Sequence, residues 1–223
     1  MTTGHDSRNF FLQGPVGRLE AILWTPSGGA KRPLACAVCH PHPLFGGTMH
    51  NKVVYQVTKS LDALGLPVLR FNFRGTGKSE GAHDGGTGEQ GDARAALDFL
   101  ATEFAGVPQL VAGFSFGSIV GLRVGCEDTR VTALIGLGLP VNRFDFAFLA
   151  ACDKPKLFIQ GARDQFGAIE KAREVFVRFA EPKQLVEVAD ADHFFVGKLD
   201  QVDRAIHEWV GQRMREPTPV KPG

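Results

Sequence analysis

The sequence predicts one α/β domain with a mostly parallel sheet, helices on both faces and an antiparallel hairpin at its N-terminal edge. Three observations support this fold class. From residue 34 onward, strand-like apolar runs alternate with segments of helical periodicity, as is typical of a parallel sheet covered on both faces. Two more strand-like runs, joined by turn residues, precede that alternation. The 223 residues are 43% apolar and 22% charged and show neither repeat nor linker, so we expect a single domain.

The N-terminal hairpin is the first predicted element. Its strands are Asn9–Gln13 and Arg18–Trp24, and Gly14-Pro15-Val16-Gly17 supplies the turn between them. Apolar runs then predict the strands Leu34–Cys39, Val68–Phe73, Leu110–Gly113, Val131–Leu137, Lys156–Gln160 and Gln184–Val188. Apolar residues three and four apart predict the helices between them, around Val53–Leu64, Ala93–Phe104, Ser118–Cys126, Ala168–Phe179 and Lys198–Met214.

The chain ends and the charge balance predict a cytoplasmic protein. Residues 1–8 are expected to be flexible, residues 9–214 to form the domain, and residues 215–223, with three prolines, to form a disordered tail. No apolar run predicts a signal peptide or a membrane span. The formal net charge of +1 attracts neither nucleic acid nor an anionic membrane. The four cysteines suit reduced, mostly buried thiols.

The segment Gly113-Phe114-Ser115-Phe116-Gly117 is the strongest functional motif. It directly follows a predicted strand and opens a helix of small residues, which is the setting of a nucleophile elbow. Its glycines let neighbouring backbone approach, and the helix N-terminus places N–H groups beside the serine hydroxyl. Ser115 is therefore the candidate nucleophile. The alternative is an ordinary serine in a tight turn.

Ser115 needs an oriented base, and two histidines follow it in the chain. His207 lies inside the last predicted helix, whereas His193 follows a strand, where a loop can reach the active site. We therefore expect His193 to be the base. The acid precedes the histidine in such sites, and Asp164 follows the preceding strand. The competing acids are Asp145, Asp153, Asp190 and Asp192.

Two backbone N–H groups are expected to stabilise the oxyanion that forms when Ser115 attacks a carbonyl. One belongs to Phe116, directly after the nucleophile. The other comes from the loop His40–Gly47, which follows an earlier strand. The two prolines of that loop have no N–H, so His42 is the expected donor and Leu44 the alternative.

These motifs together resemble the α/β-hydrolase superfamily and, within it, small lidless bacterial serine hydrolases and esterases related to dienelactone hydrolases. The similar segments are His40–Gly47, Arg70–Gly81, Gly113–Gly117, Gly161–Asp164 and Asp192–Phe194. The resemblance extends over residues 9–214 and implies hydrolysis of an ester or related acyl bond. In one respect the chain departs from dienelactone hydrolases, which use a cysteine nucleophile where this chain has Ser115.

Three other patterns are rejected as functional sites. Cys36-Ala37-Val38-Cys39-His40 matches a haem attachment motif, but it lies along a buried strand in which residues three apart face opposite sides. Gly75–Ser79 resembles the end of a phosphate-binding loop, yet Asn72 replaces the required first glycine and no helix follows. The spacing of His40, His42, His50 and His83 fits no zinc motif.

We therefore expect a serine hydrolase that acts on small acyl substrates without a cofactor or metal. Hydrolysis of amides or thioesters by the same triad, and a non-catalytic binding role, remain open, as does homodimer formation. The interval Gly138–Pro155 is too short for a multi-helix cap. Its residues Phe144, Phe146 and Phe148 form either an apolar wall of the site or a short buried segment.

Overall fold

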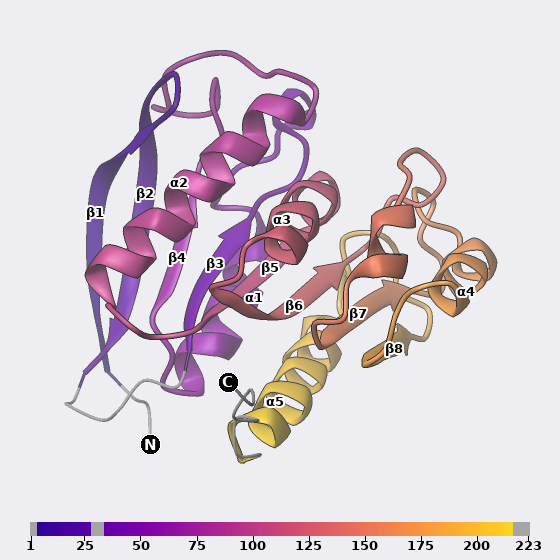
Figure 1. The fold of residues 1–223 in the computed structure, drawn as a ribbon. Helices are drawn as coiled ribbons and strands as arrows, with labels where there is room; N and C mark the ends of the chain where they lie inside the picture. Colours follow the sequence, from indigo (N-terminus) through magenta and orange to yellow (C-terminus); the bar gives the residue numbers. More distant parts are fainter. Residues whose placement is uncertain (1–3, 28–33, 216–223) are drawn as a thin grey trace.

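A single eight-stranded sheet runs through the protein, as shown by the computed structural model, which describes residues 4–27 and 34–215 (Figure 1). Its spatial order is β1-β2-β4-β3-β5-β6-β7-β8. The strands are β1 (His5–Gly14), β2 (Gly17–Pro26), β3 (Ala35–Cys39), β4 (Val68–Phe71), β5 (Gln109–Phe114), β6 (Val131–Leu137), β7 (Lys156–Gly161) and β8 (Lys183–Val188). The N-terminal hairpin lies at one edge of the sheet and β8 at the other.

Strand β2 is antiparallel to every other strand of the sheet. It pairs antiparallel with both β1 and β4, and the remaining neighbours pair in parallel. The hairpin is longer than the sequence predicts, because β1 begins at His5 rather than Asn9. Residues 5–8, expected to be flexible, pair with residues 23–26 of β2. Their side chains are mostly exposed, so this part of the strand leaves little apolar signal in the sequence.

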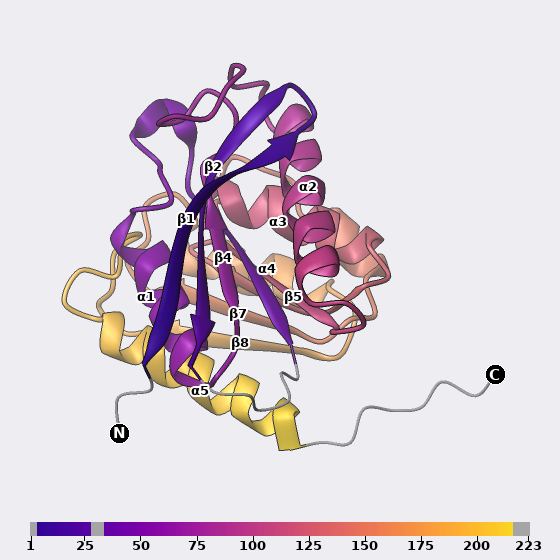
Figure 2. The ribbon, with the colours of Figure 1, turned by 90° about the vertical axis from the view of Figure 1, so that its left-hand side faces the viewer.

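Helices cover both faces of the sheet, as the alternation of elements predicts. Helices α1 (Lys52–Ala63) and α5 (Leu199–Arg215) share one face, and α2 (Thr87–Glu103), α3 (Phe116–Glu127) and α4 (Ile169–Val177) contribute to the opposite one. Figure 2 shows the sheet between α1 and α5 on one side and α2 and α3 on the other. Among the described residues, no helix combines the length and the apolar character that a membrane crossing requires.

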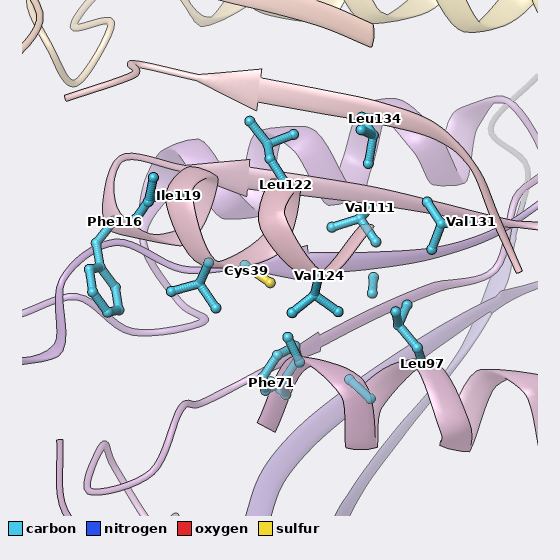
Figure 3. Close-up of a cluster of buried hydrophobic side chains, with 14 of the residues drawn as sticks. Cys39, Phe71, Leu97, Val111, Phe116, Ile119, Leu122, Val124, Val131 and Leu134 are labelled. Atoms are coloured by element: carbon cyan, nitrogen blue, oxygen red, sulfur yellow. The ribbon is translucent and has the colours of Figure 1, made fainter. Parts of the chain in front are cut away.

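Each face of the sheet has its own apolar core. Figure 3 shows one of them, where Leu97 of α2, Val111 of β5 and Val124 of α3 pack together. Burying one such side chain contributes about 1.5–3 kcal/mol. Cys36 belongs to the core beneath α1 and α5, whereas Cys39 belongs to the opposite core. The prediction that these two thiols face opposite sides of the strand is thus confirmed.

The parallel strands bring their carboxyl ends to a single edge of the sheet, where the loops after β3, β5, β6, β7 and β8 meet. Between β6 and β7 the chain contains only a short 3₁₀ helix, η2 (Ala147–Ala151), so no cap domain is inserted there. The predicted tail after Arg215 lies outside the described residues.

Candidate active site

Ser115 occupies a sharp turn between β5 and α3. Its backbone has φ 55° and ψ −121°, a left-handed conformation that costs energy for a residue with a side chain. Its N–H donates to the carbonyl oxygen of Leu137 at 2.9 Å, which ties the turn to β6. A Cβ on Gly113 would collide with the carbonyl of Gly117, so the two arms of the turn pack too closely for any larger residue.

The loops after β7 and β8 bring an acid and a histidine to this turn. Nε2 of His193 lies 2.9 Å from Ser115 Oγ, and Nδ1 of His193 lies 2.7 Å from Asp164 Oδ2. Because a carboxylate only accepts hydrogen bonds, Nδ1 carries the proton and Nε2 is free to accept from the serine hydroxyl. The three sequence-predicted residues therefore form one hydrogen-bonded chain. His193 and Asp164 are both 3% exposed.

Backbone and side-chain donors hold the Asp164 carboxylate in place. Oδ1 accepts from the N–H groups of Phe166 at 2.8 Å and Gly167 at 3.0 Å. The Gln160 amide donates to Oδ2 at 2.9 Å and to the Gly167 carbonyl at 2.7 Å, and its oxygen accepts from Leu139 N–H. Sequence reasoning missed Gln160. The available signal was a polar residue near the carboxyl end of a largely apolar strand, shortly before the acid loop.

Three of the competing acids (Asp145, Asp190 and Asp192) and the second histidine contact groups outside the triad. Asp192 Oδ1 accepts from two backbone N–H groups of its own loop, at Phe194 and Val196. Asp190 pairs with Arg163 of the loop after β7, and Asp145 Oδ1 accepts from the N–H of Ala147. His207 Nδ1 lies 3.0 Å from the Asp203 carbonyl oxygen within α5. Of the candidate acids, the structure brings Asp164 to the His193 ring.

The loop after β3 lies against the serine turn. A Cβ on Gly117 would collide with the carbonyl oxygens of Cys39 and His40, so the start of α3 touches this loop directly. The buried His40 ring fixes the loop from the other side: Nδ1 donates to the Pro41 carbonyl at 2.6 Å, and Nε2 accepts from Phe73 N–H at 2.9 Å. Burial lowers the pKa of His40 to about 4, which keeps the ring neutral.

His42 lies two residues after His40 and is the N-cap of the 3₁₀ helix η1 (Pro43–Phe45). The N–H of Leu44 donates to His42 Nδ1 at 3.3 Å, so this second candidate donor already has a partner. Within the described residues, the backbone N–H groups of His42 and Phe116 have no such partner. Burial lowers the pKa of His42, and the nearby His83 lowers it further.

A cavity of about 330 Å³ opens beside Ser115 and His193. Its walls are mainly aromatic, and the phenylalanines that line it are Phe45, Phe116, Phe144, Phe166 and Phe194. The two interpretations of the segment 138–155 each hold for some of its phenylalanines. Phe144 lines the cavity, whereas Phe146 is only 2% exposed and belongs to the core, against which Phe148 packs.

The patterns rejected as sites have structural roles. Ser79, in the segment that resembles a phosphate-binding loop, donates to the Asn72 carbonyl and accepts from Glu20 N–H, which fastens the turn to β2. His83 donates to Glu89, whose carboxylate also caps the N-terminus of α2. His50 is exposed at the other end of the loop from His42.

Comparisons with known proteins agree with this geometry. A family model described as an alpha/beta hydrolase domain matches residues 45–209. An uncharacterized protein of Rickettsia prowazekii is 34% identical over 209 residues, which cover 90% of this chain and 87% of that one. A serine hydrolase homologue from Coxiella burnetii has a TM-score of 0.86 and 38% identity, covering 91% of this chain and 97% of its own. A serine hydrolase without a lid from Xanthomonas campestris has a TM-score of 0.86 and 34% identity, covering 97% of both chains. The likeness to dienelactone hydrolases stays a prediction.

Proposed function

Because the chain belongs to the alpha/beta hydrolase domain family, we propose that it cleaves carboxylic ester bonds of small substrates through an acyl-enzyme on Ser115. One observation carries the proposal. The hydrogen-bonded chain from Asp164 through His193 to Ser115 ends in a cavity large enough for a small acyl substrate.

In the first half of the reaction, His193 Nε2 takes the proton of Ser115 as its oxygen attacks the ester carbonyl. The 2.9 Å distance between these atoms already suits that transfer. Asp164 holds the imidazole in the tautomer whose Nε2 is a free base, and it stabilises the imidazolium that forms.

The negative charge on the carbonyl oxygen then meets the N–H groups of Phe116 and His42. Both have no protein partner within the described residues, and the contact between Gly117 and the β3 loop keeps the two segments together. His193 returns its proton to the leaving alcohol, and water, activated by the same histidine, hydrolyses the acyl-enzyme.

Hydrolysis of an amide or a thioester would use the same groups. A non-catalytic binding protein would not need these three side chains to be hydrogen-bonded to one another. The test is labelling by a fluorophosphonate probe, followed by a panel of matched esters, thioesters and amides. We expect Ser115→Ala to abolish labelling and to lower kcat by about 10⁴–10⁶-fold, with thermal stability nearly unchanged.

Two histidine variants provide a matched pair for this test. His193→Ala should lose activity to a similar extent because the base is removed. His207→Ala should keep it because that ring lies within α5 and contacts Asp203. Labelling that persists in Ser115→Ala would exclude Ser115 as the nucleophile. If the matched thioester or amide is hydrolysed faster than the ester, that bond rather than the ester is the preferred substrate.

A further inference from the structure

Arg143 places a full positive charge in the wall of this aromatic cavity. The residue follows β6, in a loop whose other cavity-lining members are Pro140 and Phe144. Among the described residues that line the cavity, it is the sole lysine, arginine, aspartate or glutamate. Its side chain is exposed to solvent, so a ligand that enters the cavity has access to it.

The guanidinium packs on a ring that also contacts the proposed base, and all three residues line the same cavity. Its carbon is 5.7 Å from the centre of the Phe166 ring. That ring packs edge-on against the His193 ring, with 4.7 Å between the ring centres. Phe166 thus contacts both the cation and the base, and its backbone N–H also holds Asp164.

Arg143 lacks the acidic partner that most arginines of this protein have. Ion pairs with carboxylates occupy eight arginines of the described chain, namely Arg8, Arg18, Arg74, Arg94, Arg130, Arg163, Arg173 and Arg178. No carboxylate in the described part of the chain pairs with Arg143. The acids near the cavity mouth are engaged by their own loops, as Asp192 is.

We propose that Arg143 binds a carboxylate of the substrate, so that the site prefers esters carrying a second, anionic group. The inference rests on the proposed function and specifies its substrate class. A guanidinium matches a carboxylate with two parallel hydrogen bonds, and apolar walls strengthen such a pair relative to open solvent. The contact with Phe166 leaves the hydrogen-bond donors of the guanidinium without a carboxylate partner in the described chain.

The test compares esters that differ only in this charge. Monomethyl glutarate is set against methyl 5-oxohexanoate, in which an acetyl group replaces the carboxylate on the acyl side. On the alcohol side, 4-acetoxybenzoate is set against 4-acetoxybenzamide. We expect kcat/KM to favour the anionic member of at least one pair by about tenfold. Which pair responds shows on which side of the ester the carboxylate lies.

Arg143→Gln should reduce the ratio of kcat/KM values to near one. Arg143→Lys should retain part of the preference, because the ammonium keeps the positive charge but lacks the two parallel donors of the guanidinium. Arg204→Gln is the matched control. It removes the same charge from an exposed site on α5 that does not line the cavity, and it should leave the ratio unchanged. Fluorophosphonate labelling of Ser115 shows that each variant is folded with an assembled site.

A ratio that is unchanged in Arg143→Gln, or near one in the natural protein, overturns the role of Arg143 and leaves the proposed hydrolase activity intact. Loss of all Ser115-dependent turnover and labelling would instead contradict the proposed function. The two failures are therefore distinguishable.

Discussion

His40 takes no part in the proposed reaction, yet its ring holds the loop that carries one of the proposed oxyanion donors. The ring accepts from Phe73 N–H through Nε2 and donates to Pro41 through Nδ1. A second proton, on Nε2, would point at the Phe73 N–H and break that bond. The geometry therefore explains why only the neutral ring fits this position.

This residue makes stability depend on pH. The pKa of His40 falls from 6.5 to about 4 on folding, chiefly because the ring is buried. Between these values the unfolded chain binds a proton that the folded chain excludes, so stability is lost as pH falls from about 6.5 towards 4. The loss attributable to His40 is roughly 3 kcal/mol.

Urea unfolding at pH 7 and pH 4.5 measures this effect. The free energy of unfolding of the natural protein should fall more steeply over that interval than that of His40→Gln, in which position 40 no longer carries a titrating group. Carboxylates that titrate in the same range contribute equally to both proteins. Parallel pH profiles would show that His40 is not the group responsible.

At the scale of elements, the site depends on how closely β5, α3 and the β3 loop approach one another. Gly117 is the contact point, because a Cβ there would meet the carbonyls of Cys39 and His40. The carbonyls cannot withdraw freely, since the same loop is anchored by the His40 ring. A methyl group at this position must therefore move the loop, and His42 with it.

Gly117→Ala should lower the free energy of unfolding by about 1–3 kcal/mol and slow fluorophosphonate labelling. Gly211→Ala is the matched control in the interior of α5, where a Cβ meets only the end of the Arg215 side chain at 3.8 Å. There the change should stabilise the protein by about 0.5–1 kcal/mol and leave labelling unaltered. Chemical unfolding and labelling kinetics test both. Equal stability and labelling of Gly117→Ala and the natural protein would contradict the argument.

At the scale of the whole molecule, no cap domain covers the cavity among residues 4–27 and 34–215. The chain between β6 and β7 forms only η2, and the cavity mouth is bounded by loops with exposed apolar side chains, among them Phe45, 82% exposed, and Phe194, 45% exposed. An acyl chain gains about 0.8 kcal/mol for each methylene it buries. That gain ends where the chain leaves the cavity of about 330 Å³.

The protein should therefore prefer short acyl esters and show no activation at lipid interfaces. The measurement is kcat/KM for p-nitrophenyl esters from acetate to palmitate, with and without detergent micelles. The values should level off or fall after the first few carbons, and micelles should not raise them. A steady increase to palmitate, or a jump when micelles form, would mean that a larger apolar surface takes part.

Much of the fold could be predicted because the relevant signals are local. The alternation of strand and helix periods indicated the parallel sheet and the faces that its helices cover, since each period reflects which side of an element is buried. The prediction failed at residues 5–8, where β1 pairs with β2 through its backbone and most of its side chains are exposed. Hydrogen bonds between backbones carry no sequence pattern.

The sequence also predicted that Ser115, His193 and Asp164 come together, because each follows a strand whose carboxyl end reaches the same edge of the sheet. The tertiary structure alone decided what surrounds them. Gln160 supports Asp164, Phe144 rather than Phe146 lines the cavity, and Arg143 lies beside Phe166. These placements depend on the paths of irregular loops and on contacts between residues distant in the chain, neither of which leaves a periodic pattern in the sequence.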